Sequence, residues 1–245
     1  MGKDAPETTS NKVGLPTSTQ SLAEITVKTT QITLLILLTI IIACKKERKT
    51  VIEFSDGSKE IKYFRNQNDT STYLREFYYS NGILGTKGLI VSGKMDSVWN
   101  WYYSNGRIQN YAFLDKGLYI RERWQWYSNG LVEQIDYISK PCETGFCDGT
   151  VLYYDSLGLL HQKVEIKNGM RQDSFIQFWE NGNPFIISAY KDDIQSGFYN
   201  EFHRNKAKWV KGQFVNGKKE GRWEWYDTLG VLTKIHVFNN DHPIQ

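Results

Sequence analysis

The chain has 245 residues, enough for one or two compact domains, and its 30 Lys and Arg residues nearly balance its 27 Asp and Glu residues. Charges of both signs are interleaved along the chain, and the formal net charge is only +3. Proteins that bind nucleic acid through its phosphates usually gather basic residues on one surface. The composition therefore argues against a nucleic-acid partner.

The first 43 residues are expected to be an N-terminal extension and a lipoprotein signal peptide (1–43). Residues 32–43 form a mostly apolar run, which is too short to span a bilayer and has the length of a signal-peptide core. The run ends in Ile41-Ile42-Ala43-Cys44, which resembles the lipobox at which bacterial lipoproteins are cleaved and lipidated. The alternative is a buried strand, which the basic residues directly after Cys44 disfavour.

The mature chain is therefore expected to begin at a lipidated Cys44, followed by a basic tether at 44–50. This start predicts a membrane-anchored lipoprotein of the bacterial cell envelope, on the periplasmic or outer-membrane side. Residues 1–26 are polar and longer than the usual start of a signal peptide, whereas Val27 would begin a normal one. We expect translation to start at Val27; otherwise residues 1–26 are a disordered extension.

Residues 51–72 are expected to be a capping hairpin, turning at Asp56-Gly57, and a polar loop. The remainder, 73–245, repeats a short unit whose marker is a Gly closing a Tyr-Ser-Asn-Gly phrase. The markers are Gly82, Gly106, Gly130, Gly158, Gly182, Lys206 and Gly230, at intervals of 24, 24, 28, 24, 24 and 24 residues. A fixed period of this length is typical of a repeat array, in which no unit can bury a core alone.

Two apolar positions recur in every unit. The residue four before the marker is always aromatic, and these residues form what we call the aromatic column: Tyr78, Tyr102, Trp126, Tyr154, Phe178, Phe202 and Tyr226. The residue eight after the marker is never charged: Ile90, Leu114, Ile138, Ile166, Tyr190, Phe214 and Phe238. We expect the aromatic column to be structural. Whether the two columns share a face stays open, because one residue of register shift moves a side chain across a sheet.

Turn residues separate the apolar segments. Asn precedes the marker Gly in four units, and Asn-Gly predicts a type I′ hairpin turn. A second turn falls about eleven residues after the marker, as at Asn168-Gly169 and Asn216-Gly217. The sequence thus predicts an all-β fold, an elongated single-layer antiparallel meander of about seven 24-residue β-hairpin repeats. The alternative is a four-bladed β-propeller with two units in each blade.

The repeat also resembles a known family. The phrases at 102–106, 126–130 and 214–226 are similar to the MORN-variant repeats of the YwqK-type proteins, which are often labelled antitoxins. The position of Gly221 in the last phrase is also Gly in the preceding unit, at Gly197, and is occupied by Ser97, Arg121 and Asp173 elsewhere. The resemblance implies a β-repeat array that contacts proteins or membrane lipids, and it brings no catalytic residues.

The only interval of 28 residues contains the segment from Pro141 to Gly149, which carries Cys142 and Cys147. An insertion that brings its own pair of Cys residues into a turn predicts a disulfide in an oxidising compartment. Free thiols are the main alternative. A metal site would need further ligands, and no His lies in the loop.

No motif predicts catalysis, a metal or a cofactor. The four His residues, His161, His203, His236 and His242, show no ligand spacing. Asp155 and Asp227, three residues before their markers, are expected to accept hydrogen bonds in turns rather than to form a catalytic carboxylate pair. We therefore expect a non-enzymatic protein.

The expected function is protein binding by a β-repeat surface on the cell envelope, as an antitoxin or immunity-like partner of a protein still to be identified. The alternative is a binding module for glycans or lipid head groups, in which Trp99, Trp101, Trp223 and Trp225 would stack on sugar rings. Exposure of these four rings distinguishes the two.

The lipid anchor can be tested directly. Metabolic labelling with a fatty acid is expected to mark the wild-type protein, and Cys44→Ser should abolish the label because the acceptor sulfur is gone. A double or triple acyl anchor gives stable membrane attachment, so the variant should also leave the membrane fraction. Equal labelling of the two proteins would exclude lipidation at Cys44.

Overall fold

The computed structural model describes residues 48–143 and 147–244, and every regular element in these ranges is a β-strand. Cys44 and the expected signal peptide lie outside the described residues. The strands are β1 (Arg48–Glu53), β2 (Lys59–Phe64), β3 (Tyr73–Tyr78), β4 (Leu84–Val91), β5 (Lys94–Tyr102), β6 (Ile108–Asp115), β7 (Leu118–Trp126), β8 (Val132–Ile138), β9 (Gly149–Tyr154), β10 (Leu160–Lys167), β11 (Met170–Phe178), β12 (Pro184–Lys191), β13 (Ile194–Phe202), β14 (Lys208–Val215), β15 (Lys218–Tyr226), β16 (Leu232–Asn239) and β17 (His242–Pro243).

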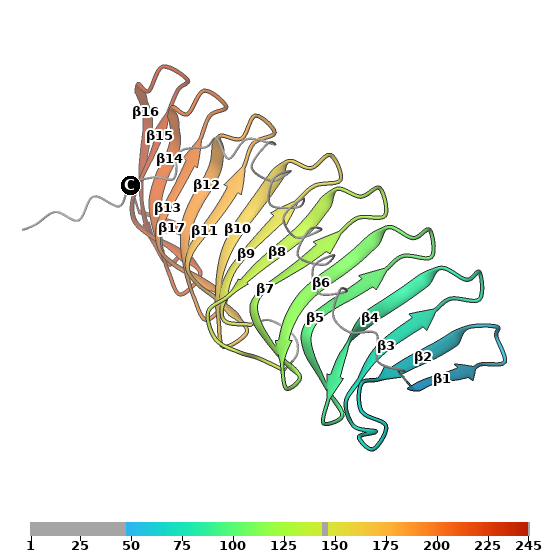
Figure 1. The fold of residues 1–245 in the computed structure, drawn as a ribbon. Helices are drawn as coiled ribbons and strands as arrows, with labels where there is room; N and C mark the ends of the chain where they lie inside the picture. Colours follow the sequence, from blue (N-terminus) through green and yellow to red (C-terminus); the bar gives the residue numbers. More distant parts are fainter. Residues whose placement is uncertain (1–47, 144–146, 245) are drawn as a thin grey trace, which may run out of the picture. The chain divides into compact units, whose positions relative to one another are not determined.

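Each strand pairs antiparallel with the next strand in the chain, so the described residues form one open meander of 17 strands (Figure 1). Strands β3 to β16 are the seven hairpins of the array, and β1 and β2 form a further hairpin before them. The predicted all-β meander is confirmed, and a propeller is excluded because the strands form a single sheet. Figure 1 also shows the strand direction rotating steadily along the sheet, as the handed twist of β-strands requires.

The two apolar columns lie on opposite faces of the sheet. Tyr73 pairs with Ile90 across β3 and β4, so these two side chains share a face, whereas Tyr78 is five residues further along β3 and points the other way. The same reasoning holds for Gly197 and Phe214, which pair and so share a face. Phe202 is five residues after Gly197 on β13 and points the other way. A sheet with one layer therefore carries apolar side chains on both faces.

The largest fully buried side chains, Trp99, Trp223 and Ser188, lie in one row across the middle of the sheet, which we call the central row; further buried side chains, among them Tyr111, Trp124 and Ile135, lie on the other face. The central row runs through Gly88, Trp99, Ala112, Arg123, Asp136, Val151, Val164, Phe175, Ser188, Tyr199, Gly212, Trp223 and His236, each beside the next on neighbouring strands. The face that carries it, the row face, also carries Ile90 and Phe214. Cross-strand neighbours of this kind are the main source of sheet stability.

Large and small residues alternate along much of the central row. Trp99 is fully buried and Trp223 is 1% exposed. A Cβ atom on Gly88 would lie 2.2 Å from the Trp99 ring, and one on Gly212 would lie 2.3 Å from the Trp223 ring. Glycine is therefore required beside each tryptophan, because the indole lies flat against the neighbouring backbone.

The aromatic column is less buried than the central row. Trp126 is 6% exposed, and the other six members are only half-buried. They lie on the face opposite the central row, near the turns at the markers.

The position of Gly221 in the family-like phrase has a structural role in the sheet. Ser97 (φ 60°), Arg121 (φ 63°), Asp173 (φ 55°) and Gly197 (φ 110°) occupy this position in other units, and all have positive φ like Gly221 (φ 67°). The pairing register shifts beside each of them. A β-bulge with a left-handed residue therefore recurs in five units, and Ser, Arg and Asp hold a conformation that glycine adopts more easily.

Stability measurements can separate the two kinds of position. Trp223→Ala should cost about 3–5 kcal/mol in the free energy of unfolding, because it empties a fully buried site. Phe178→Ala should cost less, about 1–2 kcal/mol, because its ring is only half-buried. Denaturant unfolding of both variants beside the wild type checks this order. Equal costs would mean that the core does not lie in the central row.

Candidate functional site

The turn at each marker differs from the predicted type I′ turn. The Gly82 N–H donates to the Tyr79 carbonyl at 2.9 Å, and the Tyr79 N–H donates to the Ile83 carbonyl at 2.9 Å. Gly82 has a φ of 80°, whereas Asn81 does not have positive φ. This is a type I turn followed by a left-handed Gly. The prediction of type I′ turns at Asn81, Asn105, Asn129 and Asn181 was therefore wrong.

Type I′ geometry occurs instead at the second turn of six units, all except the unit that carries the inserted segment. Both central residues have positive φ at Asn216 (49°) and Gly217 (79°), and the same holds at Asp192 (51°) and Asp193 (66°). These two-residue turns match the strand twist. The turns of one edge of the sheet thus differ in type from those of the other edge, and we call the edge with the markers the marker edge.

On the marker edge, the Asn before the marker forms two hydrogen bonds through its side chain. The Asn81 Oδ1 atom accepts a hydrogen bond from the Ile83 N–H at 3.0 Å, and its Nδ2 atom donates to the Ser104 carbonyl of the next unit at 3.0 Å. The same pair of bonds recurs at Asn105, Asn129, Asn181 and Asn205. Each Asn therefore closes its own turn and links it to the next.

A second side-chain ladder runs beside the first. Tyr103 donates its hydroxyl hydrogen to the Trp126 carbonyl at 2.7 Å, and Trp179 donates its indole N–H to the Phe202 carbonyl at 2.9 Å. Tyr79, Tyr127 and His203 make the equivalent contact, always to an aromatic-column carbonyl of the next unit. These residues stand three positions before their markers, and we call them the donor residues.

Two units replace the donor residue with Asp. The Asp155 Oδ1 atom accepts hydrogen bonds from the N–H groups of Leu157 and Leu159, both at 2.9 Å, and Asp227 does the same for Leu229 and Val231. The expectation that both Asp residues accept turn hydrogen bonds is confirmed. Since Asp closes the turn, the position before the marker no longer needs Asn, and in both units it is Leu.

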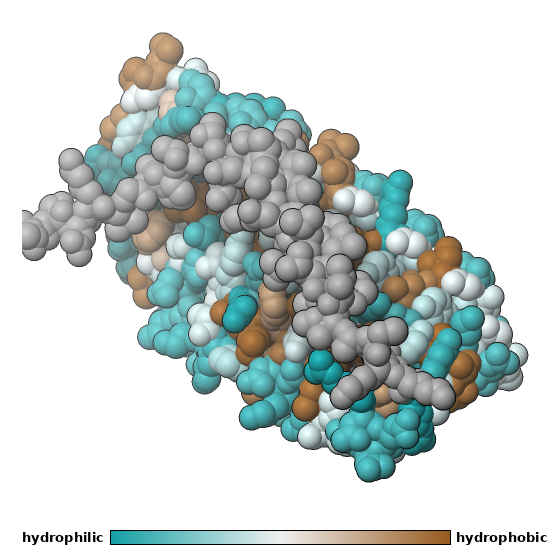
Figure 2. All heavy atoms as spheres, in the orientation of Figure 1, coloured by the Kyte–Doolittle hydropathy of each residue, from teal (hydrophilic) through white to brown (hydrophobic). Residues whose placement is uncertain are grey.

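These leucines are the most exposed of the large hydrophobic side chains on the described chain. Leu157 is 77% exposed and Leu229 is 86% exposed. The Leu131 side chain lies beside the turn at Gly158, since a Cβ atom added to Gly158 would be 3.6 Å from it. Figure 2 shows hydrophobic side chains, in brown, standing out along the upper rim, where the marker turns lie in Figure 1. We call Leu131, Leu157 and Leu159 the middle leucine patch, and Leu229, Val231 and Leu232 the terminal leucine patch.

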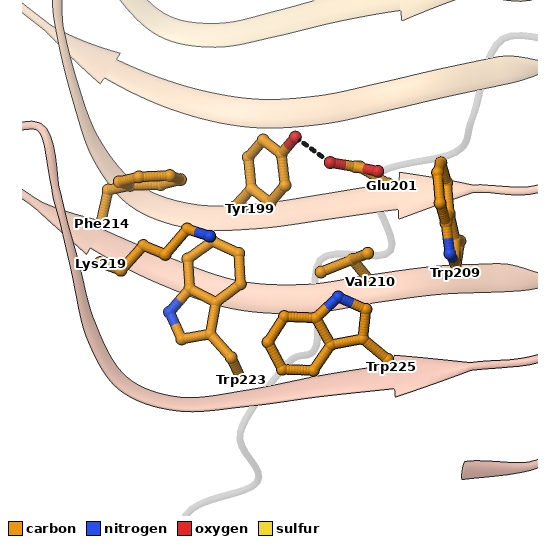
Figure 3. Close-up of a pocket in the computed structure, with 8 residues that line it drawn as sticks. All are labelled: Tyr199, Glu201, Trp209, Val210, Phe214, Lys219, Trp223 and Trp225. Atoms are coloured by element: carbon orange, nitrogen blue, oxygen red, sulfur yellow. Dashed lines mark hydrogen bonds between the residues drawn. The ribbon is translucent and has the colours of Figure 1, made fainter. Parts of the chain in front are cut away.

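The row face has a shallow hollow of about 170 Å³ near its C-terminal end. Val210 lies among its lining residues, and Tyr199, Trp223 and Trp225 contribute rings from β13 and β15 (Figure 3). The other lining residues are Glu201, Trp209, Phe214 and Lys219. Burial and a hydrogen bond to Glu201 raise the pKa of the Tyr199 hydroxyl, so this hydroxyl stays a donor at neutral pH.

The four tryptophans proposed as glycan platforms divide into two pairs. Trp99 and Trp223 are packed in the central row, so their rings have no free surface for a ligand. Trp101 and Trp225 stand two residues further along their strands and are half-buried. Of these two, Trp225 lines the hollow.

The inserted segment folds back on the sheet. The Tyr119 N–H donates to the Cys142 carbonyl at 2.7 Å, and the Cys142 N–H donates to the Tyr119 carbonyl at 3.2 Å. The Cα atoms of Cys142 and Cys147 lie 5.6 Å apart, a separation that suits a disulfide. The bond itself stays a prediction, and its position opposite the marker edge keeps it away from the leucine patches.

The described residues bring no metal-binding set together. Within 48–143 and 147–244, no group of three or more His, Cys, Asp or Glu could hold a metal ion. The His residues are dispersed: His203 is a donor residue, and His236 ends the central row. Nor does this part of the chain contain a helix long and apolar enough to cross a membrane.

The two turn types can be exchanged by mutation. Asp155→Tyr should cost about 1 kcal/mol in the free energy of unfolding, because two turn N–H groups lose their acceptor. Adding Leu157→Asn should recover most of this loss, since Asn supplies an acceptor and Tyr supplies a donor to the next unit. Thermal unfolding of both single variants and the double variant measures the coupling. Additive losses would show that the two residues act independently.

No family model matches the chain, and no curated protein is similar to it. The resemblance to MORN-variant repeats therefore stays a prediction based on the repeated phrases.

Proposed function

We propose that the chain is a non-enzymatic lipoprotein of the bacterial cell envelope that presents its β-repeat sheet for binding another protein. The observation that carries the proposal is the exposure of Leu157 and Leu229 on the marker edge. Five units place Asn at this position, where its side chain makes two hydrogen bonds. A leucine there buries little surface and makes no such bonds, so the folded chain alone does not account for it.

Grouped apolar side chains on a surface are typical of contacts with another protein. The middle leucine patch adds Leu131 and Leu159, which are 41% and 39% exposed. The terminal leucine patch adds Val231 and Leu232, which are 57% and 42% exposed. Both patches lie on one edge of the sheet, so one extended partner could contact the two together.

The expected lipid anchor and the family resemblance support the same proposal. A chain held at the membrane by Cys44 would present the sheet to proteins of the envelope. The resemblance to YwqK-type proteins favours an antitoxin or immunity-like role, in which the partner is a toxin.

Photo-crosslinking in intact membranes tests the proposal. A photoreactive residue in place of Ser156 or Thr228, beside the exposed leucines, should give a discrete adduct with one protein. Leu157→Asn with Leu229→Asn should lower the adduct yield by about tenfold, since a few residues carry most of the affinity of an interface and these two are the most exposed apolar side chains of the marker edge. The fold should be unaffected, because five other units place Asn at this position.

The matched control is Ile194→Asn, which removes an exposed side chain (49%) from a strand that starts at the opposite edge. It should leave the adduct unchanged. The absence of a discrete adduct, or equal adducts from the wild type and the double leucine variant, would contradict the proposal. If the partner is a toxin, the double variant should also lose protection against it.

A further inference from the structure

The hollow on the row face combines aromatic rings with polar groups of both kinds. Tyr199, Trp223 and Trp225 supply the rings, and the buried Val210 lies between them (Figure 3). At about 170 Å³ the hollow is smaller than a typical pocket for a drug-sized ligand, so it has room for only a small chemical group.

The charged groups of the hollow are one acid and one base. Glu201 accepts a hydrogen bond from the Tyr199 hydroxyl on Oε1, and its Oε2 atom has no hydrogen-bond partner within the described residues. The Lys219 Nζ atom lies 4.7 Å from the centre of the Trp223 ring and forms no ion pair in this part of the chain. The two charges cancel, so the hollow as a whole does not favour an anion or a cation.

The indole of Trp225 provides a further donor. Figure 3 shows its nitrogen directed toward Val210, into the space between the lining side chains. This N–H has no acceptor among the residues that the structure describes, and the ring is half-buried rather than closed off. The hollow therefore offers two unused donors, one unused acceptor and aromatic surface.

We propose that the hollow binds a neutral sugar ring. A pyranose has an apolar face of C–H groups that suits an aromatic wall, and its hydroxyl groups both donate and accept hydrogen bonds. Its hydroxyls would donate to Glu201 and accept from Lys219 and from the Trp225 N–H. A charged ligand would be attracted by one of the two charged side chains and repelled by the other, so its charge would bring no net gain. The inference does not rest on the protein-binding proposal, because the hollow lies on a face of the sheet and the leucine patches lie on its marker edge.

The site also differs from the stacking surface expected from sequence. Trp223 is 1% exposed, so it closes one side of the hollow without offering ring surface to a ligand. We expect the ligand to contact Trp225 and Trp209 instead. Trp209 is 39% exposed and stacks on His203 with ring centres 5.6 Å apart.

Titration of the full-length protein with defined oligosaccharides tests the proposal. The neutral probes are the tetramers of N-acetylglucosamine, of β-1,4-linked glucose and of α-1,4-linked glucose. The charged probes are the tetramers of galacturonic acid and of glucosamine. The indole N–H signals of the eight tryptophans are followed by nuclear magnetic resonance. We expect at least one neutral probe to shift the Trp225 signal, with a Kd at or below about 1 mM, and to bind more tightly than both charged probes.

Two variants locate the site. Trp225→Phe keeps an aromatic ring but removes the donor, and it should weaken binding about tenfold, as the loss of one hydrogen bond in a site would do. Glu201→Gln should weaken binding by a similar factor. Trp101→Phe is the matched control, because Trp101 holds the same position in another unit and does not line the hollow. It should bind like the wild type.

Three outcomes would overturn the proposal: no binding of any neutral probe up to about 10 mM, tighter binding of a charged probe, or equal loss in Trp101→Phe and Trp225→Phe. Thermal unfolding of each variant shows whether it is folded. If Trp225→Phe is not folded, Glu201→Gln, whose side chain keeps the same shape, locates the site, and wild-type affinity in Glu201→Gln then overturns the proposal.

Discussion

A sheet of one layer has no second layer to pack against, so its core must lie within the sheet itself. The central row meets this constraint by placing large side chains flat over small neighbours on the next strand. Trp99 over Gly88 and Trp223 over Gly212 are the tightest cases, because even a methyl group on either glycine would overlap the ring. Where the row holds Arg123, the neighbour is Asp136, 4% exposed, which accepts a hydrogen bond from it at 2.6 Å. Shape complementarity and charge pairing thus fill the same position in different units.

The hydrogen-bonding groups of the marker-edge turns are satisfied in two ways. One way uses the side chain before the marker to hold the fold, and the other leaves that side chain free for contacts with a partner. In most units, Asn and a donor residue close the turn and tie it to the next unit, so both side chains are occupied. In the units of Asp155 and Asp227, one carboxylate satisfies two turn N–H groups and leaves the residue before the marker free. The side chain of that residue is not needed in the turn, so it is available for contacts with a partner. In the unit of Asp227 the same substitution also ends the ladder, because the carboxylate accepts turn hydrogen bonds and has no hydrogen to donate.

The period, the strand composition and the number of hairpins could be predicted because each unit repeats the same turn and an aromatic residue at a fixed distance from it. The central row was missed because its members differ in type, from Trp and Arg to Val and Ser. A signal did exist: Gly88 and Gly212 each precede a tryptophan by eleven residues. Asn-Gly misled the turn assignment, since Asn also suits the type I turn that its own side chain closes. The hollow depends on how Lys219 and Trp225 of β15 are oriented relative to Glu201 of β13, which no spacing in one sequence specifies.

The ladder of donor residues is interrupted at one interior place. Asp155 has no hydrogen to donate, and no side chain in the described part of the chain donates to the Phe178 carbonyl. At the same place the central row contains the smaller side chains of Val151 and Val164. The 28-residue interval with the inserted segment lies just before it. In a repeat array each unit is stabilised mainly by its neighbours, so the weakest junction sets the limit of cooperativity. The junction between β10 and β11 lacks one hydrogen bond that the equivalent junctions have, so its amide hydrogens are expected to exchange with solvent earlier than theirs.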